Sequence, residues 1–131
     1  MQLVVADSSF YIHEMRSGRE PFFEMEPLAD RIEWATTGII TLEVCRGLKD
    51  PLVRDLYLDR YSTMVFLPTP NLTWEHAARM AWDMDRKGWV LPAQDILIAS
   101  ACLRHEARLL THNKHFDRMP GLLLARELAD L

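Results

Sequence analysis

The sequence predicts an α/β fold: one domain over residues 1–131, with a mainly parallel sheet of about five strands and helices on both faces. Two observations favour this fold. Short apolar runs alternate with segments of helical periodicity, and no repeat or long linker interrupts them. Strands that are joined through helices pair in parallel, and their right-handed connections place helices on both sides of the sheet.

The first half of the chain begins with a continuous apolar strand over residues 2–6. A helix follows from near Phe10, because Asp7, Ser8 and Ser9 can accept hydrogen bonds from the free N–H groups of a first helical turn. The segments expected next are a helix over residues 21–34, a short strand near 37–39, a helix that contains Glu43 and ends around Gly47, a helix from Pro51 to about Tyr61, and a strand over 64–67.

The second half contains the most regular helical pattern of the chain. Its apolar residues recur at the spacing of a buried helical stripe, which places Trp74 and Trp82 in the core. Gly88 ends this helix, and Pro92 begins the next one. The last two strands are expected at residues 108–111 and 122–124.

The composition is that of a globular protein, with 49% apolar and 26% charged residues. No segment approaches the roughly 20 apolar residues that span a bilayer, and the N-terminus lacks the basic region of a signal peptide. Cys45 and Cys102 lie in apolar helical segments, so we expect reduced thiols rather than a disulfide. These features predict a cytoplasmic protein that does not associate with a membrane.

The formal charge of −4 argues against nucleic-acid binding by the whole surface. Positive charge is nevertheless concentrated between Arg104 and Arg118, where four basic residues and three histidines accompany two acids. This segment is either a solvated helix end and loop, or the place where a phosphate substrate binds beside an acidic site.

Three acidic residues stand at the edges of apolar stretches: Asp7, Glu43 and Asp95. Burying an isolated carboxylate costs several kcal/mol, so such acids are usually paired, hydrogen-bonded or bound to a cation. Few Lys or Arg residues accompany them, which favours one shared divalent ion. Asp7 directly follows a strand, and ligands of open α/β sheets bind beyond the carboxyl ends of the strands. We therefore expect the three acids to converge at the carboxyl end of the sheet.

Each acid also has a purely structural interpretation. Asp7 would suit the N-cap of its helix, and Asp95 would be a favourable charge in a first helical turn. Glu43 would pair with Arg46 across one helical turn, an interaction of about 0.2–0.5 kcal/mol. One shared site explains all three acids by a single cause, which is why we prefer it.

Four segments carry a resemblance to a known family: residues 5–9 (VADSS), 41–48 (TLEVCRGL), 91–99 (LPAQDILIA) and 110–116 (LTHNKHF). In this order they resemble the four signatures of PIN-domain ribonucleases. The closest likeness is to the VapC-type toxins of bacterial toxin–antitoxin pairs. The resemblance extends over nearly the whole chain.

The resemblance implies an endoribonuclease that depends on Mg²⁺ or Mn²⁺, with Asp7, Glu43 and Asp95 as its catalytic, metal-binding acids. Hard divalent cations prefer carboxylate and water oxygens, which agrees with these residue types. A metal-activated water would attack the phosphate and leave 5′-phosphate and 3′-hydroxyl ends. Ser9 and Thr111 would hydrogen-bond Asp7 or a metal-bound water and hold it in place.

The fourth acidic position departs from the family pattern, because Asn113 stands where an acid is common. Asn113 would still take part in catalysis by offering its carbonyl oxygen to a metal ion or a water. One negative charge fewer weakens a second ion site more than the first, so we expect one well-held ion and one weaker ion. The same departure leaves an alternative open: a catalytically inactive PIN module that binds RNA or protein.

Substrate contacts are expected from Arg46, Lys114 and His115, which bring positive charge or a titratable imidazole near the acids. The partners that the resemblance implies are an RNA substrate, a cognate antitoxin protein and a second copy of the chain in a homodimer. Four apolar residues of the early helices are candidates either for partner contacts or for the core: Phe22, Phe23, Met25 and Leu28.

Overall fold

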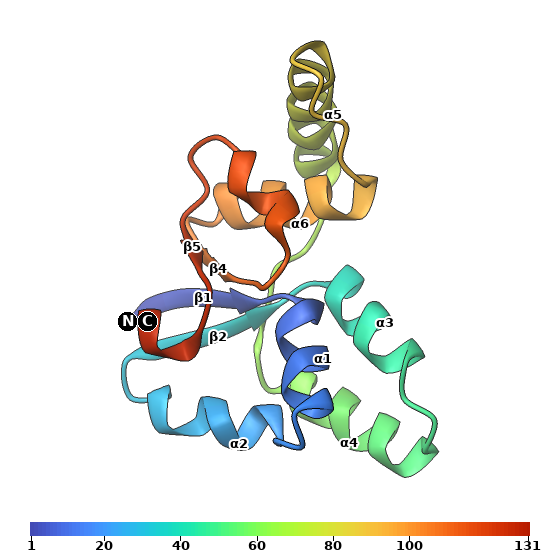
Figure 1. Ribbon diagram of the computed structural model, residues 1–131, viewed down its shortest axis with the longest axis vertical. Helices are drawn as coiled ribbons and strands as arrows, with labels where there is room; N and C mark the ends of the chain where they lie inside the picture. Colours follow the sequence, from blue (N-terminus) through green and yellow to red (C-terminus); the bar gives the residue numbers. More distant parts are fainter.

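The computed structural model describes residues 1–131 and contains one five-stranded sheet in which all neighbouring strands run parallel (Figure 1). The strand order is β3-β2-β1-β4-β5, so the first strand of the chain lies in the middle. The strands are β1 (Gln2–Ala6), β2 (Ile32–Thr36), β3 (Val65–Phe66), β4 (Arg108–Leu110) and β5 (Leu124–Ala125). The predicted α/β fold with a parallel sheet is therefore confirmed.

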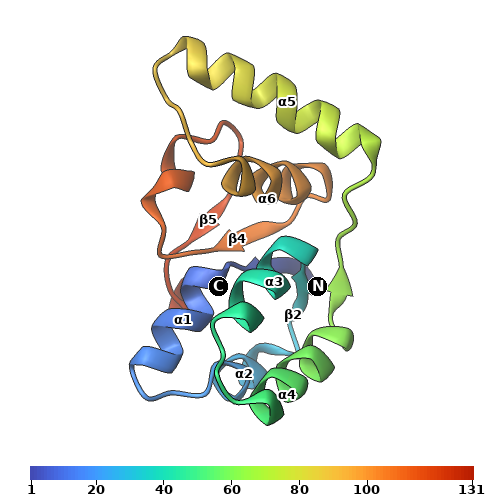
Figure 2. The same cartoon turned by 90° about the vertical axis from the view of Figure 1, so that its right-hand side faces the viewer.

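The helices form two layers, one on each face of the sheet (Figures 1 and 2). The chain moves from β1 through β2 to β3 in one direction across the sheet and then crosses back to β4. Because the crossovers are right-handed, α1 to α4 cover one face, and α5 and α6 cover the other. The helices are α1 (Ser8–Arg16), α2 (Pro21–Met25), α3 (Gly38–Arg46), α4 (Pro51–Ser62), α5 (Asn71–Arg86) and α6 (Ala93–Arg104), with short 3-10 helices η1 (Glu26–Leu28), η2 (Lys114–Arg118) and η3 (Leu128–Asp130).

The helix predicted over residues 21–34 is wrong. α2 ends at Met25 and continues only as the 3-10 turn η1. Pro27 limits the helix, because its ring nitrogen carries no hydrogen for a helical hydrogen bond. The following residues form β2, in which Trp34 pairs with the central strand β1. The β-branched and aromatic residues of this segment therefore indicate a strand. The acidic residues around them resemble the exposed face of a helix, which is why a helix was expected.

The strand predicted near residues 37–39 is also wrong, because these residues begin α3. The hydroxyl of Thr37 accepts a hydrogen bond from the backbone N–H of Ile40 at 3.3 Å and so caps the helix. The rest of this prediction is confirmed, since α3 contains Glu43 and ends at Arg46, with Gly47 as its C-cap. The strand that leads into this helix lies a few residues earlier than expected.

α5 points away from the sheet and packs against α6 (Figures 1 and 2). Its buried side chains are Thr73, Ala77 and Met84. Trp74 and Trp82 are 53% and 59% exposed, so the prediction that they lie in the core is wrong. The buried face, which includes the polar Thr73, is turned from the Trp stripe by about one residue, or roughly 100° around the helix.

The core combines the apolar central strands with an aromatic cluster on the side of α1, α2 and α4. The rings of Tyr11, Phe22 and Tyr61 form edge-on or tilted pairs with centroids 5.4–5.6 Å apart. Such pairs contribute about 0.5–1.5 kcal/mol beyond the burial of their area. Both cysteines are free thiols, and no helix is long and apolar enough to cross a membrane.

The four apolar residues of the early helices divide between the core and the surface. Phe22 and Met25 are buried in the core, and Leu28 is half-buried. Phe23 is 72% exposed. Of the four, Phe23 is therefore the one whose ring is available to a partner.

Candidate active site at the carboxyl end of the sheet

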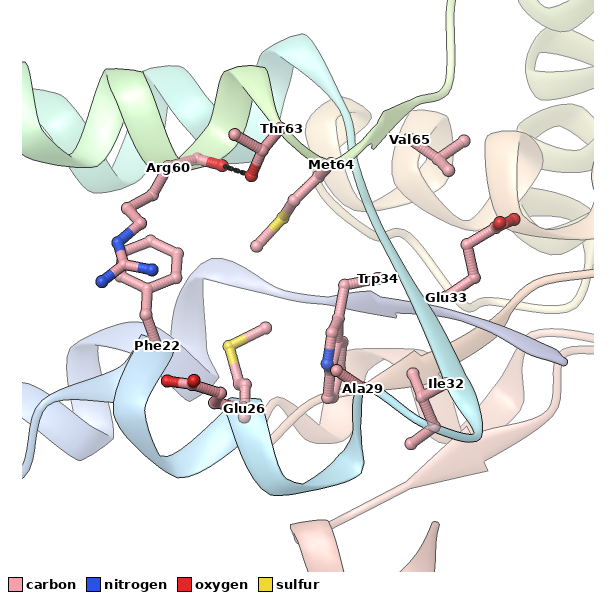
Figure 3. A pocket seen from close by; sticks show the side chains of 11 residues that line it. Phe22, Glu26, Ala29, Ile32, Glu33, Trp34, Arg60, Thr63, Met64 and Val65 are labelled. Atoms are coloured by element: carbon pink, nitrogen blue, oxygen red, sulfur yellow. Dashed lines mark hydrogen bonds between the residues drawn. The ribbon is translucent and has the colours of Figure 1, made fainter.

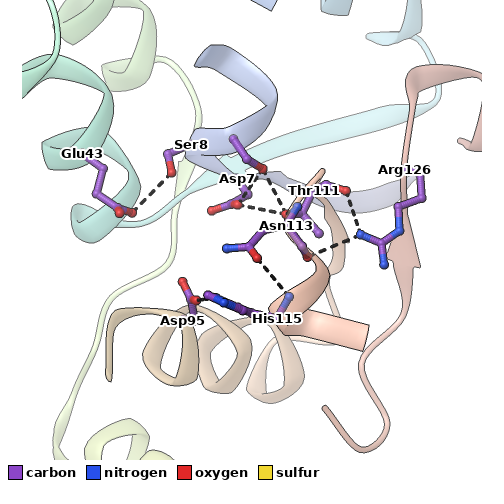
Figure 4. Close-up of polar contacts among 9 residues, drawn as sticks. Asp7, Ser8, Glu43, Asp95, Thr111, Asn113, His115 and Arg126 are labelled. Carbon is purple, nitrogen blue, oxygen red and sulfur yellow. Dashed lines mark hydrogen bonds and ion pairs between the residues drawn. The ribbon is translucent and has the colours of Figure 1, made fainter. Parts of the chain in front are cut away.

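Asp7 lies directly beyond the central strand β1, and its side chain is almost fully buried. Its Oδ2 accepts hydrogen bonds from the hydroxyls of Ser9 and Thr111, each at 2.9 Å (Figure 4). Its Oδ1 accepts no hydrogen bond, and the side chain does not cap α1 although Asp7 occupies the N-cap position. The carboxylate is thus held in one direction with one oxygen left for a ligand, which a simple capping role does not explain.

The two hydroxyls that hold Asp7 lie side by side and accept hydrogen bonds from the loop after β4. Ser9 Oγ and Thr111 Oγ1 are 3.1 Å apart. Ser9 Oγ accepts from the backbone N–H of His112 at 3.0 Å, and Thr111 Oγ1 accepts from that of Asn113 at 3.0 Å. The network therefore joins the end of the first strand to a loop about a hundred residues later in the chain.

Glu43 reaches the same region from α3. Its Oε1 is 3.5 Å from the hydroxyl of Ser8, at the start of α1. Burial raises the pKa of Glu43, and the negative charges of Asp7 and Asp95 raise it further. Arg46 lowers the pKa of Glu43 slightly but forms no ion pair with it. The alternative in which Glu43 is simply paired with Arg46 is therefore not the arrangement found.

Asp95 projects from the first turn of α6, and its side chain is 13% exposed. Its Oδ2 is 2.8 Å from Nδ1 of His115, which lies in η2 (Figure 4). Burial raises the pKa of Asp95, the hydrogen bond to His115 lowers it, and the charge of Asp7 raises it. Asp95 therefore has His115 as a hydrogen-bond partner, and its pKa also depends on the charge of Asp7.

The carboxylates of Glu43 and Asp95 point toward that of Asp7 in Figure 4. No Lys or Arg forms an ion pair with any of the three. No three His, Cys, Asp or Glu side chains lie close enough together to hold a metal ion by themselves. The donor set nevertheless fits a hard divalent cation, because its free atoms are carboxylate oxygens and a cation would offset their mutual repulsion. A metal-binding role for these acids stays a prediction.

Asn113 has a structural task that its sequence position did not reveal. Its side-chain Oδ1 accepts the backbone N–H of His115 at 2.9 Å and caps η2. Lys114 is exposed on the same 3-10 helix, and Arg46 is exposed at the end of α3. The amide oxygen of Asn113 therefore already serves the loop, and only its second lone pair is available to a water or an ion.

Arg126 supports the site, although no pattern in the sequence indicated this role. Its guanidinium Nη1 donates to the backbone carbonyls of Thr111 at 3.3 Å and Asn113 at 3.4 Å, and its Nη2 pairs with Asp117. Arg126 thereby ties the loop after β4 to the segment after β5. Its partners are mainly backbone carbonyls, which have no signature in a sequence.

Two large hollows of the surface lie away from these acids. One, of about 380 Å³, is lined by residues of α2, β2 and α4, including Phe22 and Trp34 (Figure 3). The other, of about 460 Å³, is lined by residues of α3, α4 and β3, including Leu42 and Tyr61. Both hollows are lined mainly by hydrophobic residues, and neither contains Asp7. The candidate active site is therefore the group of acids at the carboxyl end of the sheet and not either hollow.

The match to known families decides what kind of domain carries this site. A model of the PIN domain matches residues 4–122, a range that includes all the acids described above. The chain belongs to the PIN domain family. No sequence among the curated proteins matches this PIN domain.

Solved structures share the fold of this PIN domain. The VapBC2 complex of Rickettsia felis bound to promoter DNA gives a TM-score of 0.78 at 20% identity, covering 95% of this chain and 98% of the other. VapBC-1 of Haemophilus influenzae gives 0.77 at 20% identity, covering 95% and 97%. VapBC-5 of Mycobacterium tuberculosis, a toxin–antitoxin system, gives 0.63 at 19% identity, covering 95% and 97%. At these identities the likeness establishes a common fold.

Proposed function

We propose that this PIN domain is an endoribonuclease that depends on Mg²⁺ or Mn²⁺ and serves as the toxin of a type II toxin–antitoxin pair. The observation that carries the proposal is the state of Asp7. Its Oδ2 is held by two hydroxyls, its Oδ1 has no donor, and two further carboxylates, of Glu43 and Asp95, face it. A hydrated divalent cation is the ligand that such an arrangement of oxygens suits best.

Asp7, Glu43 and Asp95 would hold the cation, which when bound supplies a nucleophilic water and polarises the scissile phosphate. Ser9 and Thr111 keep the Asp7 carboxylate turned toward the open side of the site. These roles separate the residues that touch the cation from those that orient them.

The residues around the acids would handle the phosphates of the substrate. His115 orients Asp95 through the 2.8 Å hydrogen bond, and its ring is 49% exposed, so it can also meet a phosphate oxygen. Lys114 and Arg46 are exposed cations beside the acids and would attract the RNA backbone. Asn113 would act by shaping the loop and by offering its remaining lone pair to a water.

The ribonuclease proposal is tested with the purified chain and a labelled single-stranded RNA. We expect cleavage with Mg²⁺ or Mn²⁺, none with EDTA, and products that carry 5′-phosphate and 3′-hydroxyl ends. Asp7→Asn should abolish cleavage, because the amide replaces one ligand oxygen and the negative charge. Asp59→Asn, on the exposed face of α4, is the matched control and should cleave like the parent. Cleavage that survives Asp7→Asn would refute the assignment.

The partner proposals rest on the fold likeness and on exposed apolar side chains. Leu52 and Leu56 are 77% and 53% exposed and lie four residues apart on one side of α4, and Phe23 of α2 is also exposed. These side chains would accept an apolar segment of an antitoxin, while a second copy of the chain would complete a homodimer. Co-expression with the adjacent reading frame and sizing by light scattering test both; a monomer that captures nothing would contradict them.

The alternative is a PIN module that binds RNA or protein without cleaving it. The observation that favours it is Asn113, whose side chain caps η2 where an acid is common in the family. Metal-dependent cleavage that requires Asp7 separates the enzyme from the module. RNA binding without any cleavage, at several Mn²⁺ concentrations, would favour the module.

A further inference from the structure

Trp89 lies beside two cationic side chains in the connection between α5 and α6. The guanidinium carbon of Arg118 is 5.3 Å from the centroid of the Trp89 ring, and Nζ of Lys87 is 5.5 Å from it. The half-buried ring packs against the core, and its backbone N–H donates to the carbonyl of Met84 at 3.0 Å. The turn before it is fixed by Gly88, whose φ is +82°. The ring is therefore an anchored platform for both cations.

This platform is linked to the acidic site through η2, which carries both His115 and Arg118. Arg118 ends η2, one 3-10 turn after His115. His115 in turn contacts Asp95 at 2.8 Å (Figure 4). We call the series that begins next to Asp95 the basic row; it comprises His115, Arg118, Trp89 and Lys87. The row leads from the acids to the C-terminal end of α5, where Lys87 is the C-cap.

The two cations of the basic row are not neutralised within the chain. Neither Arg118 nor Lys87 takes part in any of the four ion pairs of the structure. The acid next to Arg118 in sequence, Asp117, is paired with Arg126 instead. Both cations are exposed. In a chain whose formal charge is −4, two adjacent uncompensated cations beside an aromatic ring are a local exception.

Positive charge continues beyond Lys87. A hollow of about 260 Å³ beside α5 has both Arg79 and Lys87 in its lining, against a single carboxylate, that of Asp83. An anionic chain that follows the basic row would therefore meet one further cation, Arg79, after leaving Trp89.

We propose that Lys87 and Arg118, positioned by Trp89, bind two phosphates of a single-stranded RNA and set the path of the strand away from the acids. This inference rests on the proposed ribonuclease function and adds the contacts that hold its substrate. A flexible single strand suits the row, because cations that follow the backbone and an aromatic ring beside them are the usual elements of single-strand binding. Trp89 acts on the RNA mainly through the two cations.

The test measures binding separately from cleavage. A fluorescent single-stranded RNA of about 16 nucleotides is titrated with protein in EDTA, so that it stays intact, at several salt concentrations between about 50 and 200 mM. Each phosphate contact to a single strand contributes about 0.7 to the slope of log K against log salt. Lys87→Gln and Arg118→Gln should therefore each lower the slope by about 0.7 and weaken binding roughly five-fold at about 0.1 M salt; the double variant should weaken it roughly 25-fold.

Variants of Trp89 test its positioning role, and Arg86 gives a matched control. Trp89→Ala should weaken binding several-fold, whereas Trp89→Phe, which keeps a ring under the cations, should bind close to the parent. Arg86 is a neighbouring cation on another aromatic ring, 4.4 Å from Trp82, and Arg86→Gln should leave the slope unchanged. Thermal unfolding of every variant checks that a loss of binding is not a loss of folding.

The outcomes separate this inference from the proposed function. Unchanged slopes in Lys87→Gln and Arg118→Gln, or an equal loss in Arg86→Gln, would overturn the inference even if the chain cleaves RNA through Asp7. A parent chain that fails to bind the RNA would overturn it as well. Binding that depends on both cations, in a chain that cleaves nothing with Mg²⁺ or Mn²⁺, would uphold the inference and reject the enzyme.

Discussion

Replacing Thr111 by valine tests the hydroxyl network that orients the candidate metal ligand. Thr111 is fully buried, and its hydroxyl donates to Asp7 at 2.9 Å and accepts from the backbone N–H of Asn113 at 3.0 Å. Valine has nearly the same shape, so Thr111→Val removes the two hydrogen bonds without leaving a cavity. The change therefore isolates the polar contribution of the side chain.

The magnitude follows from the two partners that are lost. A hydrogen bond to a charged group contributes about 1.5–3 kcal/mol and a neutral one about 0.5–1.5 kcal/mol. Ser9 still donates to the same Asp7 oxygen, which limits the loss. We expect the free energy of unfolding at pH 7 to fall by about 2–4 kcal/mol. Cleavage should fall about 10–100-fold, as is usual when a residue that orients a metal ligand is removed.

Urea unfolding followed by circular dichroism measures the first effect, and the RNA cleavage assay measures the second. Thr63→Val is the control, because the hydroxyl of Thr63 donates to a backbone carbonyl at the exposed end of α4. It should change the free energy of unfolding by less than about 0.5 kcal/mol and leave cleavage intact. A Thr111→Val chain that is as stable and as active as the control would refute the proposed role of the network.

Three further predictions concern charge, metal binding and the loop after β4. Glu43→Gln should raise the free energy of unfolding of the metal-free chain at pH 7, because burial and neighbouring acids raise the pKa of Glu43. The gain should vanish below about pH 4, where the parent carboxyl is protonated in the folded and the unfolded state, and a loss of stability at pH 7 would contradict the prediction. A calorimetric Mn²⁺ titration should give one well-held and one weaker ion, whereas two equally tight ions would show that Asn113 costs the site nothing. Arg126→Met should speed hydrogen exchange of residues 111–118 and reduce cleavage, because two carbonyls and Asp117 lose their partner; unchanged exchange would show that the loop is held by other contacts.

The parts of the fold that could be predicted are those in which local pattern and tertiary environment agree. The strand that precedes Asp7 is apolar from Leu3 to Ala6 because it lies between two other strands and two helix layers. The helix after Pro92 is likewise apolar on most sides because it is largely buried. In both segments burial requires apolar side chains along most of the length. The apolar run can therefore be recognised without knowing which elements pack against it.

The errors arose where neighbours decided the outcome. Ile32 and Trp34 form a strand because the edge of β1 is available to pair with them, which no local signal conveys. Trp74 and Trp82 are exposed because α5 packs on α6 through the neighbouring face, which carries Thr73, Ala77 and Met84. Arg126 escaped notice because its partners are backbone groups 13 and 15 residues earlier.

The placement of the acids was predictable in part. Asp7 directly follows a strand, and Asp95 lies in the first turn of a helix. The topology of a parallel sheet sets both positions. The direction of each carboxylate was not, because it depends on hydroxyl and imidazole donors from the loop after β4. The residue types of a site can thus be inferred from one sequence, while its hydrogen bonds require the folded chain.

The central strand of this sheet is the first to leave the ribosome, but one of its two neighbours, β4, is among the last. The backbone N–H of Asp7 donates to the carbonyl of Leu110, and its side chain accepts from the hydroxyl of Thr111, which lies 104 residues further along the chain. A nascent chain that lacks its final fifth therefore contains all three acids, but of the two hydroxyls that orient Asp7 it has only that of Ser9. The order of synthesis itself therefore delays the assembly of the site until the protein is nearly complete.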